Sequence, residues 1–184
     1  RINDFLSWEP HVKDAPNAQS IHLSSEITLK NVNFTYPSSE RKILDNISLT
    51  IPVGKTIALV GQSGSGKSSI AQLLTRIYDV NGNEGTGIFV DGVDLRKLKV
   101  DEWRNQVAVV SQDVFLFHDT IFNNIALGKI GATHDEVVEA AKKAFAYDFI
   151  QRMPEGFNSI VGDRGMKLSG GERQRISIAR AFLR

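Results

Sequence analysis

The chain has 184 residues, 41% of them hydrophobic, and its 22 basic and 21 acidic side chains leave a net charge of +1. This composition is ordinary for one globular domain with a substantial core, and the balanced charge argues against a nucleic-acid partner, which would need a strongly basic face. With no cysteine and four scattered histidines, the chain excludes a disulfide scaffold and a thiolate metal site.

The sequence contains no targeting or membrane-spanning segment. No apolar run approaches the roughly 20 residues needed to cross a bilayer. The first residues, Arg1 to Asp4, contain neither an initiator methionine nor a signal-peptide core. We expect the chain to be part of a longer protein.

Residues 1–25 are predicted to connect the domain to a preceding segment, because they contain two prolines and no sustained hydrophobic periodicity. Alternating apolar and polar residues from Glu26 onward predict a half-buried strand that ends near Tyr36, and residues 47–51 predict a second strand. The short apolar run of residues 56–60 is typical of a central strand buried on both faces.

A helix is predicted directly after this run, over residues 67–78, because apolar side chains recur there at helical spacing. These side chains are Ile70, Leu73, Leu74 and Ile77. Residues 88–90 and 107–110 are further strand candidates, with a turn signal at Asp91-Gly92 between them.

Helix signals dominate from residue 119 to about residue 160. The sequence Thr133-His134-Asp135-Glu136 is a capping box, and the apolar face predicted behind it comprises Val137, Val138, Ala141, Ala144 and Phe145. A second capping box, Ser169-Gly170-Gly171-Glu172, begins a last helix whose predicted inner face comprises Ile176, Ala179, Phe182 and Leu183.

The sequence Gly61-Gln62-Ser63-Gly64-Ser65-Gly66-Lys67-Ser68 matches the pattern G-x-x-x-x-G-K-[ST] of a phosphate-binding loop. It lies between a predicted buried strand and a predicted helix, as the chemistry requires, because glycines let successive N–H groups converge on phosphate oxygens at the positive end of a helix. A glycine loop that merely turns the chain would give this match in about one case in a hundred. The pattern therefore predicts a nucleotide site, with Mg·ATP as its ligand.

The residues of this loop have different expected roles. The Lys67 ammonium should reach the β- and γ-phosphates, and the Ser68 hydroxyl should ligate Mg²⁺. The remaining residues of the predicted binding set, which offer mainly backbone, are Gly61, Ser63, Gly64, Ser65, Gly66 and Ser69.

The start of the last helix is a second candidate for phosphate contact. Its capping box explains Ser169 and Glu172 without any ligand. It does not explain Gly170 and Gly171, each of which costs about 1 kcal/mol relative to alanine in a helix interior. Because bare backbone at a positive helix end suits close approach of an anion, all four residues are predicted to contact nucleotide.

Together, the two glycine-rich helix starts resemble the ATP-binding domain of ATP-binding-cassette (ABC) transporters, over about residues 26–184. The signature of that family reads L-S-G-G-Q followed by a basic helix, and this chain has Leu168-Ser169-Gly170-Gly171-Glu172-Arg173-Gln174-Arg175, with Glu172 in place of glutamine. The resemblance implies an α/β fold: a P-loop NTPase core with an N-terminal antiparallel β subdomain and an inserted α-helical subdomain at about residues 119–175.

The resemblance implies roles for three further residues. Tyr36 is similar to the aromatic residue that stacks on adenine, and Ile43 would pack near the base or ribose. Gln112 is similar to the glutamine that contacts Mg²⁺ or the attacking water, so Lys67 and Gln112 form the implied catalytic pair. Without the phosphate-binding loop, we would interpret Tyr36 as an aromatic residue that covers the edge of the core. A lone glutamine after a strand, such as Gln112, is usually an ordinary loop residue.

Other segments resemble parts of an exporter that meet its membrane domains. Residues 161–165 resemble the loop that touches those domains, and residues 115–128 resemble the start of the helical subdomain that lines the same contact. Residues 1–16 resemble the connector after the last membrane helix in exporters of the lipid A flippase and multidrug type. The implied organisation is a connector at residues 1–25 and a partial nucleotide-binding domain at residues 26–184, on the cytoplasmic face of a membrane such as the bacterial inner membrane.

The family's catalytic carboxylates have no counterpart in the sequence. The resemblance implies a buried strand that ends in Asp-Glu beyond the signature helix, and later a histidine that contacts the γ-phosphate. Phosphoryl transfer depends on placing Mg²⁺ and water in line with the leaving oxygen. We therefore expect the chain alone to bind ATP but to be nearly inactive as an ATPase, and to be less stable than a longer chain that contains this strand.

The leading functional hypothesis is the ATPase of a membrane exporter that transports a lipid, drug or peptide. In that family two copies meet head to tail, so that each nucleotide lies between Lys67 of one copy and Ser169 and Gly171 of the other. The alternative is a soluble ABC-type ATPase or regulatory ATP-binding module. A DNA-repair version is disfavoured because no sustained heptads separate Lys67 from Ser169, and a small-molecule kinase would leave residues 168–172 unexplained.

Overall fold

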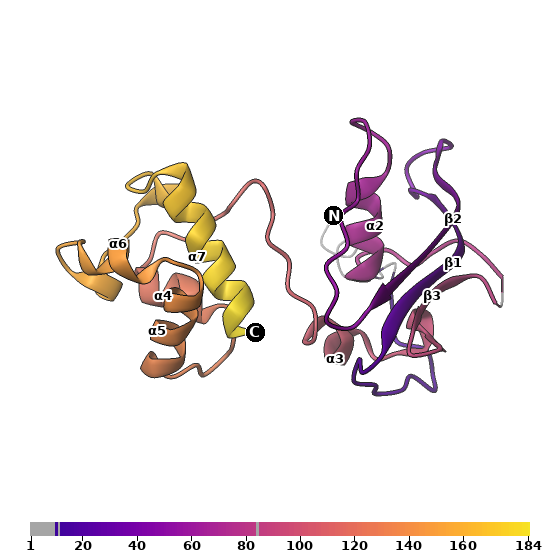
Figure 1. Cartoon of the computed structure of the whole chain (residues 1–184), viewed down its shortest axis with the longest axis horizontal. Helices are drawn as coiled ribbons and strands as arrows, with labels where there is room; N and C mark the ends of the chain where they lie inside the picture. The colour runs from indigo at the N-terminus through magenta and orange to yellow at the C-terminus, as the bar shows by residue number, and fades with distance from the viewer. Residues whose placement is uncertain (1–9, 11, 84) are drawn as a thin grey trace, which may run out of the picture. The chain divides into compact units, whose positions relative to one another are not determined.

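A computed structural model describes residue 10, residues 12–83 and residues 85–184. The chain divides into two compact units, Arg1–Val107 and Ala108–Arg184. In Figure 1, all the labelled strands belong to the first unit, and α4, α5, α6 and α7 belong to the second. Each unit has its own hydrophobic core. The part of the predicted connector at residues 1–9 and residue 11 lies outside the described residues.

The first unit contains a four-stranded sheet in which every neighbouring pair of strands is antiparallel. The strands are β1 (Glu26–Thr35), β2 (Lys42–Pro52), β3 (Gly87–Val90) and β4 (Val93–Asp94), in the order β2-β1-β3-β4. Leu29 of β1 lies opposite Leu49 of β2 and Ile88 of β3, so that one face of the sheet forms the core. The predicted strands at residues 26–36, 47–51 and 88–90 are therefore confirmed.

The helices in the described part of this unit are α2 (Lys67–Leu74), the 3₁₀ turn η1 (Leu95–Lys97) and α3 (Val100–Arg104). Leu73 of α2 and Trp103 of α3 are buried in the same core as the sheet. The predicted helix over residues 67–78 is too long, because the backbone turns left-handed at Arg76 (φ 53°) and leaves Ile77 52% exposed.

Two predicted strands are wrong. Residues 56–60 and residues 107–110 have irregular backbone, and Val60 and Val109 are 91% and 60% exposed. Their apolar composition suits strands buried on both faces, but a strand forms only where a neighbour completes its backbone hydrogen bonds. Among the described residues, the strands of the sheet pair with neither segment.

The second unit is built from helices. They are α4 (Ile121–Ala126), α5 (His134–Lys143), α6 (Tyr147–Gln151) and α7 (Gly170–Leu183), with the 3₁₀ turns η2 (Gly156–Asn158) and η3 (Asp163–Gly165). Its core is formed mainly by aliphatic residues such as Ile125, Val137, Ile150 and Ile176. Both predicted capping boxes are present at the starts of α5 and α7. The described helices include none that is long and apolar enough to span a membrane.

Two aromatic residues assigned to helix faces are not buried. Phe145 follows the end of α5 in a left-handed conformation (φ 54°) and is 86% exposed. The helical spacing no longer applies beyond Ala144, where α5 ends, and Ala146 takes the next buried position. Phe182 is 53% exposed, because the buried stripe of α7 runs through Ile176, Ala179 and Leu183.

Candidate functional site

The glycine-rich loop of residues 61–66 turns sharply into α2. Gly64 and Gly66 have φ angles of 79° and 90°, which favour glycine because a side chain is strained there. A Cβ atom at Gly66 would lie 2.6 Å from Leu44 Cδ2 and 3.3 Å from the carbonyl oxygen of Ile43. Glycine at position 66 is therefore required both by the turn and by close packing against β2.

Lys67 is held by the loop that precedes it. Its Nζ donates to the carbonyl oxygens of Gly61 (2.9 Å) and Gln62 (2.7 Å) and to Ser65 Oγ (3.2 Å). These bonds curl the loop around the ammonium group, and the side-chain contacts remain exposed to solvent. A compact point charge at the mouth of a glycine loop suits a phosphate group.

The N-terminus of α2 has no side-chain cap. Gly66 is its N-cap residue, and no side-chain oxygen accepts a hydrogen bond from the first N–H groups of the helix. In contrast, α4, α5 and α7 are capped by Thr120, Thr133 and Ser169. Free N–H groups at a positive helix end are suited to a phosphate oxygen. The residues present thus fit the nucleotide phosphates that the sequence predicts.

Tyr36 and Ile43 lie close to the start of α2. The Tyr36 hydroxyl donates to Gln72 Oε1 (2.7 Å) and lies 2.8 Å from Ser69 Oγ. Its ring makes edge contacts with Phe34 and Tyr78, at centroid distances of 4.8 and 5.2 Å. Ile43 approaches Gly66 with its carbonyl oxygen and with Cγ2. The first unit therefore brings together Tyr36, Ile43, the loop residues Gly61, Ser63, Gly64, Ser65 and Gly66, and the helix residues Lys67, Ser68 and Ser69.

The remaining predicted site residues, Gln112, Ser169, Gly170, Gly171 and Glu172, belong to the second unit. Gln112 lies in irregular, exposed chain between Ser111 and Asp113, where the Ser111 hydroxyl donates to the carbonyl oxygen of Asp113 (2.7 Å). This small turn leaves the Gln112 side chain at the surface.

The start of α7 is capped by its own side chains. Ser169 Oγ accepts from the Glu172 N–H (3.3 Å), and Glu172 Oε2 accepts from the Ser169 N–H and Oγ–H, both at 2.8 Å. The Ser169 N–H, followed by its hydroxyl, holds the pKa of the Glu172 carboxyl below its usual range. A Cβ at Gly170 or Gly171 would meet nothing closer than 3.9 or 3.8 Å. Packing therefore does not require either glycine.

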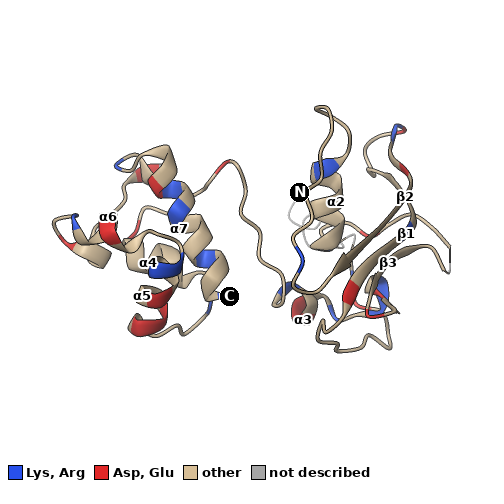
Figure 2. Ribbon diagram, in the orientation of Figure 1, with Lys and Arg blue, Asp and Glu red and all other residues tan. Residues whose placement is uncertain are grey.

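Charges of both signs are spread over both units. Figure 2 shows basic residues along α7 and acidic residues on α5. Groups of three or more His, Asp or Glu residues that could hold a metal ion do not occur in the described part of the chain. The prediction that Ser68 and Gln112 contact Mg²⁺ concerns other kinds of ligand and stays a prediction.

The sequence prediction does not include several residues with extensive polar networks, among them Arg76, Asn124 and Arg180. Arg76 follows the end of α2, is 1% exposed and donates a hydrogen bond to the carbonyl oxygen of Leu98. Arg180 of α7 donates to the carbonyl oxygens of Asn124 (2.5 Å) and Phe115 (2.8 Å), and burial lowers the pKa of its guanidinium group. The carbonyl groups that the two arginines bond lie 20 to 65 positions away in the sequence, so no local pattern indicates these contacts.

Comparisons with known proteins agree with this geometry. A family model described as "ABC transporter" matches residues 44–184. The chain is 50% identical, over 94% of its length, to an ATP-dependent lipid A-core flippase of Pectobacterium atrosepticum, of which it covers 29%. It is 45% identical, over its full length, to the putative multidrug export ATP-binding/permease protein YgaD of Bacillus subtilis, of which it covers 31%.

The structural comparison gives the same family. A solved structure titled "Structure of a bacterial Atm1-family ABC exporter with ATP bound" matches 98% of the chain with a TM-score of 0.90 and 42% identity, and the match covers 31% of that protein. The predicted α/β fold of the ABC ATPase type is therefore confirmed, although residues 56–60 and 107–110 form no strands here. The chain spans less than a third of the length of these relatives. The chain belongs to the ABC transporter family, in its nucleotide-binding part.

Proposed function

We propose that the chain binds Mg·ATP at the loop of residues 61–68 and forms part of the ATPase that powers a membrane exporter. One observation carries the proposal: α2 begins without a side-chain cap, directly after a loop that curls around the Lys67 ammonium. Family membership supports it, because the relatives are named as an ATP-dependent flippase and an export ATP-binding/permease protein.

The residues of the first unit would hold the nucleotide in complementary ways. Backbone N–H groups of the loop and of the first turn of α2 would donate to phosphate oxygens, and Lys67 would neutralise charge on the β- and γ-phosphates. Tyr36, whose hydroxyl is fixed by Gln72, would present its ring to the adenine. Ile43 would add an apolar contact beside the loop.

Ser68 and Gln112 would hold Mg²⁺. When bound, the metal neutralises negative charge that builds up on the phosphates. Gln112 would also orient the attacking water.

We infer the partners from the chain's membership of the ABC transporter family. A second copy of the domain would contribute Ser169, Gly170, Gly171 and Glu172 to the nucleotide held at Lys67. Closing of this dimer on ATP and its reopening would drive attached transmembrane domains. The domain would then lie on the cytoplasmic face of a membrane, such as a bacterial inner membrane.

Nucleotide binding can be tested by titrating a fluorescent ATP analogue into the chain with and without Mg²⁺. The Lys67→Ala variant should lose most of the affinity, about tenfold or more, because a charge-assisted phosphate contact is removed. Lys55→Ala removes the same charge from an exposed position of the first unit and should leave the affinity unchanged. Equal affinities of Lys67→Ala and the unaltered chain would refute the phosphate assignment.

A further inference from the structure

The N-terminal segment, residues 12–25, is bound to the rest of the first unit. The Gln19 N–H donates to the carbonyl oxygen of Lys97 (2.7 Å), and the Lys99 N–H donates back to the carbonyl oxygen of Gln19 (2.9 Å). Gln19 thereby forms a parallel bridge with Leu98. A connecting segment with bridged backbone moves together with the chain that it contacts.

A second set of bonds holds the end of this segment before β1. Asp91 accepts from the N–H groups of Ser24 (2.7 Å) and Ser25 (2.9 Å) and also from the N–H of Glu26 (2.8 Å). These bonds, that from Glu26 foremost, lower the pKa of Asp91 to about 2. Gln106 adds a bond from Nε2 to the carbonyl oxygen of Ile21 (2.6 Å).

Asp14 of the N-terminal segment caps α3. Its Oδ1 accepts from the Val100 N–H (2.8 Å), across 86 positions of the sequence. The residue at the N-cap position of α3, Lys99, provides no side-chain cap of its own. A helix of five residues is unstable by itself, so this long-range cap helps to fix its position.

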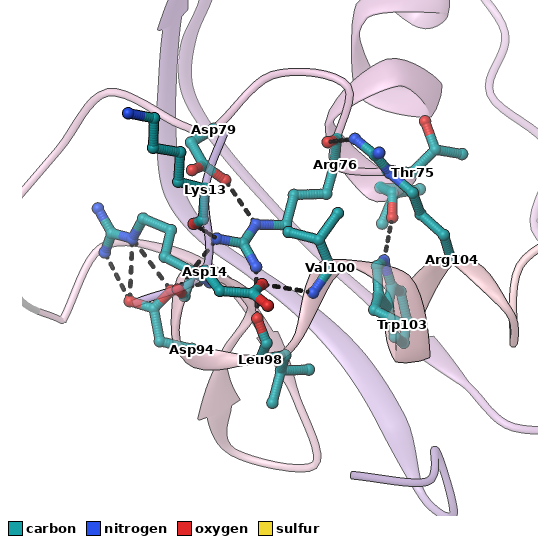
Figure 3. Close-up of polar contacts among 12 residues, drawn as sticks. Lys13, Asp14, Thr75, Arg76, Asp79, Asp94, Leu98, Val100, Trp103 and Arg104 are labelled. Atoms are coloured by element: carbon teal, nitrogen blue, oxygen red, sulfur yellow. Dashed lines mark hydrogen bonds and ion pairs between the residues drawn. The ribbon is translucent and has the colours of Figure 1, made fainter. Parts of the chain in front are cut away.

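In turn, α3 caps the C-terminal end of α2 (Figure 3). Trp103 Nε1 donates to the carbonyl oxygen of Leu74 (2.8 Å), and Arg104 Nη2 donates to that of Arg76 (2.6 Å). Carbonyl groups at a helix end lack partners within the helix. The end of α2 is therefore held by side chains of α3.

Arg76 closes the network. Figure 3 shows its guanidinium group between Asp79, Leu98 and the N-terminal segment. It pairs with Asp79 Oδ1 (2.9 Å) and donates to the carbonyl oxygens of Leu98 (2.5 Å) and Lys13 (3.2 Å). A buried arginine with a left-handed backbone is costly in free energy. The hydrogen bonds and the ion pair of Arg76 therefore offset a substantial cost at the end of α2.

We propose that the N-terminal segment positions the phosphate loop through the far end of α2. The eight residues of α2 form a rigid rod of about 12 Å, with Gly66 and Lys67 at one end and the contacts to α3 at the other. Asp14, Trp103 and Arg76 are positioning residues, because they act on the loop through the helix. This inference rests on the proposed function, because it states that the N-terminal segment affects how tightly the loop binds nucleotide.

The test compares three variants of the chain. Asp14→Ala removes the cap on α3, whereas Asp14→Asn keeps an oxygen acceptor there. Asp101→Ala removes a carboxylate of equal charge from an exposed position of α3 itself. Hydrogen–deuterium exchange without nucleotide would be measured at α2 and α3, and titration with a fluorescent ATP analogue would follow.

We expect Asp14→Ala to raise exchange in both α3 and α2 by about fivefold and to weaken nucleotide binding by about threefold. Asp14→Asn and Asp101→Ala should stay within about twofold of the unaltered chain. Reciprocally, nucleotide should slow exchange at the Val100 N–H.

Unchanged exchange in α2 of Asp14→Ala would overturn the coupling, and so would an equal effect in Asp101→Ala. If exchange in α2 of Asp14→Ala rose but nucleotide affinity stayed unchanged, the proposed effect of α2 on the phosphate loop would be overturned. A failure of the unaltered chain to bind nucleotide would overturn the proposed function alone, because the exchange in α2 is measured without ligand.

Discussion

Each unit presents a helix with glycine at its start, Gly66 as the N-cap of α2 and Gly170 as the first residue of α7, but the two helix starts are chemically different. At α2 the N-cap is a left-handed Gly66 without a side-chain acceptor, and a lysine occupies the loop. At α7, Ser169 and Glu172 satisfy each other's backbone groups. One start is therefore open to an anion and carries a positive side chain, whereas the other already holds a carboxylate. Only the first has the features of a site that binds phosphate by itself.

The C-terminal ends of α2 and α7 also differ, in how deeply the arginine beside each is buried and in what it bonds. Beside α2, Arg76 is 1% exposed and is paired with the carboxylate of Asp79. Within α7, Arg180 is only partly buried and donates to neutral oxygens of Asn124 and Phe115. Because an unpaired buried charge is far costlier than a lost neutral hydrogen bond, the end of α2 depends more strongly on its arginine.

The largest expected effect is that of Arg76→Met. It leaves the Asp79 carboxylate unpaired and three carbonyl groups short of a donor, which should lower the free energy of unfolding by about 3–5 kcal/mol. Arg180→Met, the matched change in the second unit, should cost about 1–3 kcal/mol. Urea unfolding followed by tryptophan fluorescence and by circular dichroism at the helix band measures both.

The two probes separate the units. Trp103 is buried in the core of the first unit, and no tryptophan follows it in the sequence. Its fluorescence therefore reports on the first unit, and circular dichroism reports mainly on the helical second unit. Arg76→Met should shift the fluorescence transition more than Arg180→Met does. Equal shifts in fluorescence for the two variants would contradict the contrast between the arginines.

Local patterns in the sequence predict the features that arise within a few residues. The capping boxes at Thr133 and Ser169, and the turn at Gly66, depend on spacings of three residues or fewer. The segments at residues 56–60 and 107–110 could not be predicted in this way, because a strand exists only when a distant segment pairs with it.

The polar network around α2 could not be predicted from the sequence either. Asp14 caps a helix 86 positions away, and Arg76 bonds a carbonyl group 63 positions away. Neither residue differs in its sequence neighbourhood from an ordinary surface charge. The phosphate loop was predictable from its motif, whereas the side chains that fix its supporting helix became visible only in the fold.

Exchanging glycine for alanine should have opposite effects at the two helix starts. At Gly66 the new Cβ would meet Leu44 Cδ2 at 2.6 Å and the φ angle is 90°, so we expect a loss of about 2 kcal/mol from strain and overlap. At Gly171 the nearest atom would be the Arg175 guanidinium nitrogen at 3.8 Å, and we expect a gain of up to about 1 kcal/mol from helix propensity. Thermal unfolding midpoints measure both changes.

Gly64→Ala serves as the control for strain without overlap. Its φ angle is 79°, but nothing lies within 4 Å of the new Cβ, so its loss should be smaller than that of Gly66→Ala. If Gly171→Ala lowered the midpoint as far as Gly66→Ala does, the fold itself would require glycine at the start of α7, and contact with a ligand would not explain it.

The smallest expected effect concerns the carboxylate at the start of α7. Glu172→Gln keeps a side-chain acceptor for the Ser169 N–H but removes the charge that the positive helix end favours. The pKa of Glu172 lies below its ordinary 4.5 in the folded chain, so the charged form stabilises folding above that value, and this stability is lost as the pH falls through the folded pKa. At neutral pH the variant should be less stable by about 0.5 kcal/mol.

This difference should vanish when unfolding is measured at a pH well below 4.5, because both side chains are then neutral. Glu136→Gln makes the same change in the capping box of α5, where Lys129 chiefly lowers the pKa of Glu136, and it should show the same sign. The two variants should differ in ATP binding by the proposed dimer, since only Glu172 would face phosphate there, and removal of its charge should tighten binding. A loss of stability that persists unchanged at acid pH would mean that the charge of Glu172 has no part in holding α7.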